Sequence, residues 1–497
     1  MKQKTITTGI SEFDDILGGG LIANRVYLIQ GTPGCGKTTL SLQFLLGGVR
    51  LGEKVLYVTL SESKTELVDS AAAHGWSLDG IEICELIAHE NELNSDNQYT
   101  MFHPSEVELS ETTRLIIEQI ERIKPQRVVI DSMSEIKLLA QSSLRYRRQV
   151  LALKSFFVGR TCTTLFLDDM TTTEEDDRQL QSIAHGVIHL EQLAPDYGAE
   201  RRRISITKLR GQRYRGGYHD MTIKTGGLAI FPRLVAAEHA RASERRQLNS
   251  GLKPLDDILG GGIDFGTSLL LLGPAGAGKS SMALQYALAA GRAGERAAMF
   301  TFDERLDTLR QRCEGIGMGV DVAMKARLLT IQPVDPAEMS PGEFGHAVRI
   351  AAEGLDGNPP ARVVIIDSLN GYLQAMPEEK HLIAQLHELL TYLGHLNVIT
   401  ILIVAQHGLL GNAMQTPLDT SYLADGVILF RYFESEGEVR QAISVVKKRS
   451  GPHERTIREF RIDKKGIRVG QILNHFHGVL TGTPVFTGED STLLKAR

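Results

Sequence analysis

Two short stretches of the sequence decide the fold: GTPGCGKT at residues 31–38 and GPAGAGKS at residues 273–280. Each matches the pattern G-x4-G-K-[ST], follows a short apolar run and precedes a segment with helical periodicity. The glycines let backbone N–H groups turn toward phosphate oxygens, and the following helix adds its positive N-terminal end. Chance glycine-rich turns would not recur in the same context, so the sequence predicts a nucleotide site in each half of the chain.

The two loops contain the residues expected to bind ATP and Mg²⁺. Lys37 and Lys279 are expected to contact the β- and γ-phosphates, and the hydroxyls of Thr38 and Ser280 to bind Mg²⁺. Cys35 is interpreted as a small residue that fits the loop; the alternative is an oxidation-sensitive thiol activated by Lys37. The residues predicted to surround the phosphates are Gly31, Gly34, Cys35, Gly36 and Thr39 in the first loop and Gly273, Gly276, Ala277, Gly278 and Ser281 in the second.

The chain is a tandem repeat. GISEFDDILGGGL at residues 9–21 returns as GLKPLDDILGGGI at residues 251–263, and the same interval separates the two glycine-rich loops. A period this long indicates whole domains rather than a solenoid, and we expect the domains at residues 1–240 and 241–497. Apolar runs alternate with helical patterns in both, which predicts an α/β fold with a mostly parallel twisted sheet flanked by helices.

A buried-strand pattern ends in an aspartate in each half. VVID at residues 128–131 and VVIID at residues 363–367 place Asp131 and Asp367 after apolar runs. A carboxylate at the end of such a strand can reach the Mg²⁺ or its water ligands, so both aspartates are predicted to lie in the nucleotide sites. The alternative is that each merely caps a following helix.

A further acidic position follows the strand after each P-loop helix. Glu62 stands there in the first half, and Asp303 and Glu304 stand there in the second. A carboxylate at this point can orient and deprotonate the water or hydroxyl that attacks the γ-phosphate, which makes these three residues the candidate catalytic acids. The alternative is that they begin the next helix, where negative charge is favourable.

Two cations close an alternating strand in each half. Lys208 and Arg210 stand at the end of the strand in the first half, and Lys447 and Arg449 in the second. Strand residues two apart point to the same side of the sheet, so each pair is predicted to reach the triphosphate bound to a neighbouring subunit. That prediction requires an oligomer. The alternative is that the four side chains are ordinary solvated surface residues.

Composition narrows the functional classes. The chain has 497 residues, 42% of them hydrophobic and 23% charged, with a formal net charge of -5. This balance fits a packed protein and gives no global basic field for nucleic acid or anionic lipid. No apolar run is long enough to cross a membrane and no signal-peptide pattern begins the chain, so a cytoplasmic protein is expected. The four cysteines show no CxxC spacing, which gives no indication of a zinc site or a disulfide framework.

The sequence resembles the KaiC family of circadian-clock ATPases and autokinases. The resemblance rests on the two P-loops, the DDILGGG segment before each, the acidic positions, IDS at residues 130–132 and again at 366–368, and the strand end KLRG at residues 208–211. The resemblance covers nearly the whole chain. It implies two tandem RecA-like P-loop domains that form a homohexameric ring with ATP between subunits. It also implies hydrolysis of ATP mainly in the first domain and autophosphorylation in the second. ATP and Mg²⁺ are the implied cofactors, with Asp303 as a further metal ligand.

The resemblance also suggests phosphorylation sites and partners. The family's adjacent Ser-Thr acceptors correspond here to Ser421 and Tyr422, and Ser421 is expected to be the main acceptor because tyrosine carries its oxygen farther from the backbone. The first acidic pair is reduced to Ser61-Glu62. Only residues 485–497 follow GTP at 482–484, a shorter tail than the one that engages the activator KaiA, which argues against KaiA dependence. A KaiB-like partner on the first domain is implied by the resemblance alone.

Two rival functions share most of these features. A RecA- or RadA-like DNA-dependent motor has the same P-loop, sheet and ring, but the net charge of -5 and the lack of a basic stretch with interspersed aromatic residues disfavour it. A nucleotide-gated scaffold without catalysis would keep the P-loops and never turn over ATP. Binding of labelled single-stranded DNA and a measurement of ATP turnover would separate these functions from the first.

Overall fold

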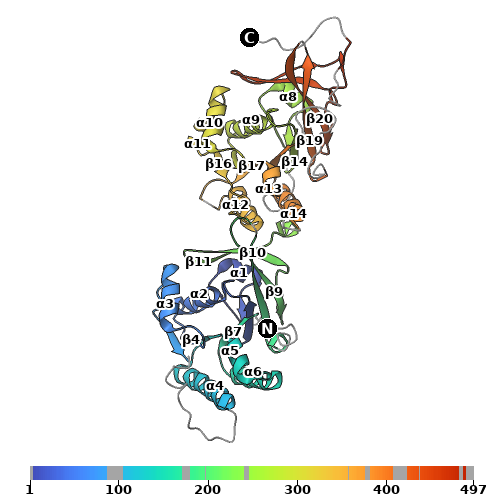
Figure 1. Cartoon of the computed structure of the whole chain (residues 1–497). Helices are drawn as coiled ribbons and strands as arrows, with labels where there is room; N and C mark the ends of the chain where they lie inside the picture. Colours follow the sequence, from blue (N-terminus) through green and yellow to red (C-terminus); the bar gives the residue numbers. More distant parts are fainter. Residues whose placement is uncertain are drawn as a thin grey trace. The chain divides into compact units, whose positions relative to one another are not determined.

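A computed structural model describes residues 4–86, 104–170, 180–195, 197–239, 246–355, 357–374, 381–406, 422–435, 437–480 and 485–487. The chain divides into two compact units, Met1–Arg233 and Leu234–Arg497, which we call the first and the second domain (Figure 1). Within the described ranges, no helix is sufficiently long and apolar to span a membrane.

The first domain is built on a nine-stranded sheet, counted over its described residues, in the order β11-β10-β9-β8-β3-β7-β6-β4-β5. Strands β5, β4, β6, β7, β3 and β8 are parallel, and β9, β10 and β11 continue the sheet antiparallel. The strands are β3 (Val26–Gly31), β4 (Val55–Thr59), β5 (Ile81–Glu85), β6 (Arg127–Asp131), β7 (Thr163–Asp169), β8 (Gly186–Leu193), β9 (Arg201–Leu209), β10 (Tyr218–Lys224) and β11 (Gly227–Phe231). The helices are α1 (Ser11–Ile16), α2 (Lys37–Arg50), α3 (Lys64–Ala73), α4 (Pro104–Ile123), α5 (Met133–Ala140) and α6 (Ser143–Val158).

The described part of the second domain repeats this arrangement with the order β16-β15-β17-β18-β14-β19-β20-β21-β22. Its strands are β14 (Ser268–Gly273), β15 (Arg296–Thr301), β16 (Leu329–Pro333), β17 (Ala361–Asp367), β18 (Ile399–Ala405), β19 (Gly426–Ser435), β20 (Glu438–Lys448), β21 (Arg458–Asp463) and β22 (Gly466–Ile472). Its helices are α8 (Lys253–Ile258), α9 (Lys279–Arg292), α10 (Leu306–Gly315), α11 (Val320–Lys325), α12 (Pro341–Glu353), α13 (Leu369–Gln374) and α14 (Leu382–His395). Two mostly parallel sheets with flanking helices confirm the predicted fold class.

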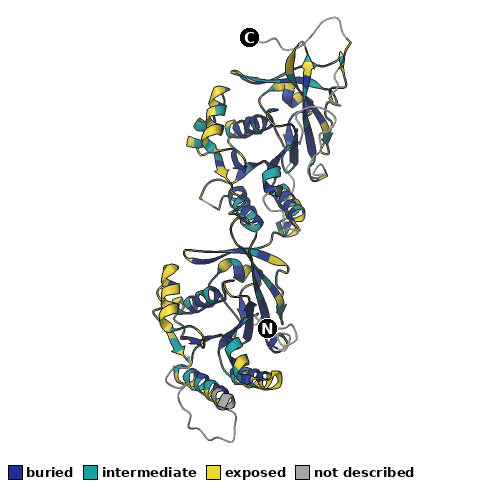
Figure 2. Cartoon of the chain, in the orientation of Figure 1, coloured by how far each residue is buried: buried dark blue, intermediate teal, exposed yellow. Residues whose placement is uncertain are grey.

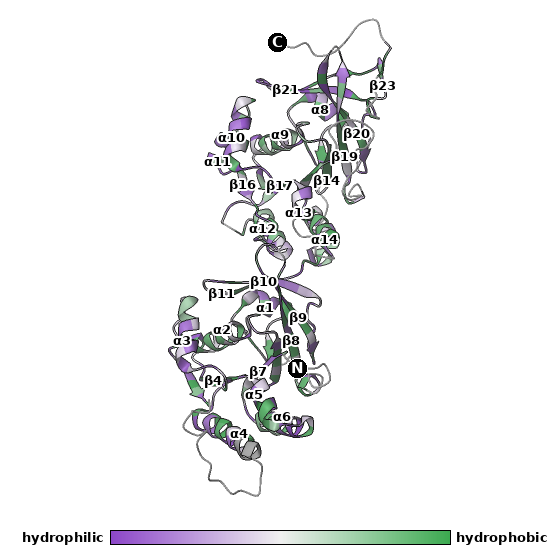
Figure 3. Cartoon of the chain, in the orientation of Figure 1, coloured by the Kyte–Doolittle hydropathy of each residue, from purple (hydrophilic) through white to green (hydrophobic). Residues whose placement is uncertain are grey.

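The apolar runs form strands because both faces of each sheet are covered. Strands β3, β4, β6, β14 and β15 are buried almost throughout. The burial of the sheet interiors can be followed in Figure 2, and the hydrophobic β14 is labelled in Figure 3. Each sheet separates two hydrophobic clusters, one on either face. Parallel strands buried on both faces carry continuous apolar runs instead of alternating ones, as these strands do.

Glycine is required where each P-loop turns into its helix. Gly36 and Gly278 precede α2 and α9 with left-handed φ values of 104° and 93°. A Cβ on Gly278 would lie 2.6 Å from the side chain of Ile462 on β21. The loop therefore needs glycine for its backbone conformation and for the close approach of the neighbouring strand. This geometry leaves the N-terminal N–H groups of both helices free of a side-chain cap.

Candidate nucleotide-binding sites

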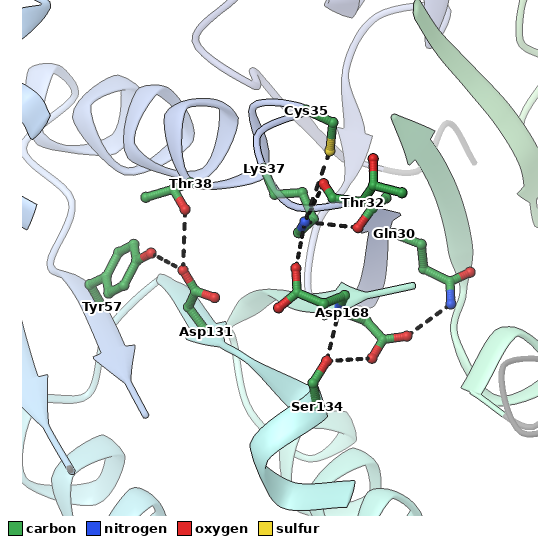
Figure 4. Close-up of polar contacts among 11 residues, drawn as sticks. Gln30, Thr32, Cys35, Lys37, Thr38, Tyr57, Asp131, Ser134 and Asp168 are labelled. Carbon is green, nitrogen blue, oxygen red and sulfur yellow. Dashed lines mark hydrogen bonds and ion pairs between the residues drawn. The ribbon is translucent and has the colours of Figure 1, made fainter. Parts of the chain in front are cut away.

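The first P-loop connects β3 to α2 and folds around the ammonium group of Lys37 (Figure 4). This group donates hydrogen bonds to the carbonyl oxygens of Gly31 (2.8 Å) and Thr32 (3.0 Å) and forms an ion pair of 2.6 Å with Asp169 Oδ1. Lys37 is only 8% exposed. The loop thus holds a buried positive charge at the carboxyl end of β3, where a phosphate group would bind.

Asp131 lies at the end of β6, beside the P-loop helix. Its Oδ2 accepts hydrogen bonds from the hydroxyl of Tyr57 (2.5 Å) and from that of Thr38 (3.4 Å) (Figure 4). Burial raises the pKa of Asp131, Asp169 raises it further, and the bond from Tyr57 opposes both effects. A hydroxyl and a carboxylate in contact are the hard oxygen donors that Mg²⁺ prefers, so Thr38 and Asp131 fit its requirements.

Glu62 follows β4 and lies close enough to Asp131 and Asp169 for their charges to act on it. Burial raises the pKa of its carboxyl group, and the charges of Asp131, Glu66 and Asp169 raise it further. Its Oε2 atom is buried and has no hydrogen-bond partner among the described residues. A carboxylate with a raised pKa and an uncommitted oxygen has the properties of a general base.

The second P-loop repeats this arrangement around Lys279. The ammonium group donates to the carbonyl oxygens of Gly273 (2.9 Å) and Pro274 (2.7 Å), and burial lowers its pKa to about 8. Burial raises the pKa of Asp367, at the end of β17, to about 6; Ser280 opposes the shift by a hydrogen bond, and the charges of Asp303 and Glu304 add to it. The second site is thus poised to accept a metal cation that would compensate its carboxylates.

The acidic pair of the second domain is tied to other side chains. Asp303 accepts a hydrogen bond from the hydroxyl of Ser368, which follows β17. Glu304 accepts two bonds from the guanidinium of Arg312, from Nε at 3.0 Å and from Nη2 at 2.8 Å. The same guanidinium donates from Nη1 to the hydroxyl of Ser281 on α9 at 2.8 Å. Glu304 and Glu62 therefore occupy corresponding positions with different partners.

The predicted interface cations lie at the opposite end of the sheet from the P-loop of their own domain. Lys208 pairs with Val187 at the start of β8, whereas the P-loop follows the end of β3. Lys208 donates to the carbonyls of Gln181 (2.5 Å) and Ser182 (3.2 Å), and Arg210 to Ser182 (3.1 Å). Neither cation can therefore serve the site in its own domain.

The second domain holds the cations predicted to lie at its interface in the same way. Lys447 donates to the carbonyl of Ala424 at 2.7 Å, and Arg449 donates to that of Tyr422 at 3.3 Å. Arg449 also forms an ion pair of 3.6 Å with Asp425. Of the two predicted phosphorylation sites, Ser421 lies outside the described residues, while Tyr422 is 54% exposed.

The structure also adds residues that sequence reasoning missed. Asp169, Tyr57 and Arg312 contact the predicted site residues directly. Of these, Asp169 could have been found by comparing the two halves, because the position that pairs with the P-loop glycine differs between them. Gly31 pairs with Asp169, while the corresponding Gly273 pairs with Ala405. The thiol alternative for Cys35 loses its support, since burial outweighs the charge of Lys37 and raises the pKa of the thiol.

The described residues contain no group of three or more histidine, cysteine or carboxylate side chains placed to hold a metal ion by themselves. Mg²⁺ bound by one or two protein oxygens together with the phosphates of a nucleotide needs no such group. The donors available for it are Thr38 and Asp131 in the first site and Ser280 and Asp367 in the second.

Comparison with known proteins identifies the family. The family model described as "ATPase: KaiC" matches residues 6–235 and again residues 248–474. The chain belongs to the KaiC family. It is 29% identical to the circadian clock oscillator protein KaiC of Thermostichus vulcanus, over 99% of this chain and 94% of that protein. It is 26% identical to the circadian clock protein KaiC3 of a Synechocystis species, over 97% of this chain and 95% of that protein. Both halves are therefore KaiC-type ATPase domains.

Proposed function

We propose that this KaiC-family ATPase hydrolyses ATP mainly in its first domain, phosphorylates itself in its second domain, and works as a hexameric ring. The observation that carries the proposal is the free carboxylate oxygen of Glu62 beside a P-loop whose Lys37 is already buried at the phosphate position. The ring is supported by the interface cations, since the fold keeps Lys208 and Arg210 away from the site of their own domain.

In the proposed mechanism, hydrolysis in the first site depends on Lys37, Thr38, Asp131 and Glu62. When ATP enters, Lys37 exchanges its contact with Asp169 for the phosphates. Bound Mg²⁺ would supply charge neutralisation for the phosphoryl oxygens, held through Thr38 and Asp131. Glu62 accepts a proton from the water that attacks the γ-phosphorus, and its raised pKa lets it hold that proton during the reaction. ADP and phosphate then leave together with the proton.

Self-phosphorylation in the second site needs an acceptor hydroxyl brought to the γ-phosphate of a neighbouring subunit. Ser421 is the proposed main acceptor and Tyr422 the weaker one. Tyr422 is exposed and lies next to Arg449, which fits a segment at a subunit interface. Transfer requires the acceptor oxygen to come within about 3–3.5 Å of the phosphorus, which favours the shorter side chain.

The test uses the full chain incubated with Mg²⁺ and γ-labelled ATP, followed for released phosphate and for label on the protein. Lys279→Ala is expected to abolish labelling of the protein and to leave most phosphate release intact. Lys37→Ala is expected to abolish most phosphate release. A phosphopeptide map then locates the label. Equal labelling of wild type and Lys279→Ala would overturn the kinase assignment, and no turnover in the wild type would favour a scaffold.

A further inference from the structure

The guanidinium of Arg312 is directed entirely at the second nucleotide site. Among the described residues it donates three hydrogen bonds, two to the carboxylate of Glu304 and one to the hydroxyl of Ser281, both predicted site residues. Helix α10 is anchored separately by Leu309 and Cys313, both fully buried. The helix thus does not depend on the guanidinium for its packing, and Arg312 is available for a role in the site.

The corresponding position in the first domain has no cation. Arg312 lies eight residues after Glu304, and Ser70 lies eight residues after Glu62. Leu67 and Ala71 are buried on α3 as Leu309 and Cys313 are on α10, so Ser70 and Arg312 occupy equivalent places on equivalent helices. Ser70 is exposed, and Glu62 retains an uncommitted buried oxygen.

We propose that Arg312 is a positioning residue that holds the carboxylate of Glu304 away from water and thereby suppresses ATP hydrolysis in the second domain. The bidentate contact occupies both carboxylate oxygens and turns them toward α10. ATP bound there then survives long enough to be used for phosphoryl transfer. This inference rests on the proposed division of labour between the two domains and names its structural determinant.

The contact affects hydrolysis and phosphoryl transfer differently because water and the acceptor hydroxyl are positioned in different ways. In hydrolysis, the water oxygen forms a bond to the γ-phosphorus, the bond to the β–γ bridging oxygen breaks, and the water proton passes to the carboxylate. A water molecule has no covalent tether, so it depends on that carboxylate for its position. An acceptor hydroxyl is positioned by its own chain and loses less when the carboxylate is engaged elsewhere. The contact therefore hinders hydrolysis more than transfer.

The experiment is made in the full chain carrying Glu62→Gln, so that the remaining phosphate release comes from the second site. Arg312→Ser introduces the residue of the first domain, and Arg312→Lys keeps the charge. We expect Arg312→Ser to raise kcat for phosphate release roughly tenfold, a part of the ~10²–10⁴-fold that a general base supplies. KM should stay within about twofold, and label on the protein per ATP consumed should fall by a similar tenfold factor. Arg312→Lys keeps the charge but loses the bidentate fork, so it should restore only part of the original ratio.

Two further variants keep the inference falsifiable. Adding Glu304→Gln to Arg312→Ser should remove the gain in phosphate release, because no base is then left to be freed. Ser70→Arg, in the Glu304→Gln background, should lower hydrolysis by the first site severalfold. An unchanged or lower kcat in Arg312→Ser with normal thermal unfolding would overturn the inference, as would a gain that persists without Glu304. Failure of the proposed function is visible separately, as undiminished phosphate release in the Glu62→Gln parent.

Discussion

Replacing Asp169 by asparagine tests how the first site holds its P-loop lysine. Asp169 Oδ1 lies 2.6 Å from the ammonium nitrogen of Lys37, and the aspartate is 30% exposed. ATP can recruit this lysine only by displacing the carboxylate, which also repels the phosphates. Asparagine keeps the size and shape of the side chain and removes the charge. We therefore expect Asp169→Asn to bind ATP more tightly than the wild type.

The magnitude follows from the strength of the contact. A hydrogen bond between charged groups contributes about 1.5–3 kcal/mol, and partial solvent exposure of the carboxylate reduces this to about 1–2 kcal/mol. At about 1.4 kcal/mol per factor of ten, the Kd should fall by roughly five- to thirtyfold. The assay is an equilibrium titration with Mg²⁺ and a non-hydrolysable ATP analogue, in a Lys279→Ala background so that only the first site binds.

The second domain offers a matched control. Ala405 stands opposite Gly273 in the sheet as Asp169 stands opposite Gly31. Ala405→Asp, measured in a Lys37→Ala background, should weaken binding at the second site by a similar factor. If Asp169→Asn binds the analogue with an unchanged or higher Kd, Asp169 does not compete for the lysine. A loss of affinity seen only with Mg²⁺ present would show instead that the carboxylate helps to hold the metal.

Three other predictions concern catalysis, pH and the acceptor. Glu62→Gln should lower steady-state phosphate release about 10²-fold without weakening ATP binding, as followed with a phosphate sensor and by titration. Burial raises the pKa of Asp367 from 3.8 to about 6, so the folded state holds this proton more tightly than the unfolded state, and stability falls as pH rises through that window. In nucleotide-free protein, Asp367→Asn should therefore become more stable relative to the wild type as the pH rises. The difference between their free energies of unfolding should grow by up to about 3 kcal/mol between pH 4 and pH 7.5, measured by urea unfolding. Ser421→Ala should remove most label from the protein, and loss of label in Tyr422→Phe instead would move the acceptor to the tyrosine.

The parts of the molecule that could be predicted from sequence are those determined by local patterns. The P-loops, the strands that precede them and the aspartates that close β6 and β17 each depend on a few consecutive residues. The glycine at position 36 is an example, because its left-handed φ of 104° is required by the turn itself. Repetition of the whole pattern in one chain made these predictions stronger than a single motif would allow.

The contacts that sequence reasoning missed are long-range or depend on side-chain direction. Tyr57 and Asp131 are 74 residues apart and meet because β4 and β6 are neighbouring strands, a pairing that no local pattern indicates. Arg312 is only eight residues from Glu304, but Glu304 precedes α10 and its direction depends on the turn before the helix. An arginine on a helix surface is by default a solvated side chain, so its sequence position gave no signal.

The two sites share their backbone and differ in the charges around it. At three matched positions the first site has Asp169, Tyr57 and Ser70, while the second has Ala405, Met299 and Arg312. The first site thus gains a carboxylate, and its proposed base, Glu62, keeps an oxygen without a partner among the described residues; the second site gains a guanidinium that engages its proposed base, Glu304. Because the P-loops and the aspartates that end β6 and β17 are equivalent, they cannot by themselves make one site hydrolyse ATP faster than the other. Any division of labour must therefore arise in the surrounding residues, and the charged ones among them have the largest effect on a phosphoryl group.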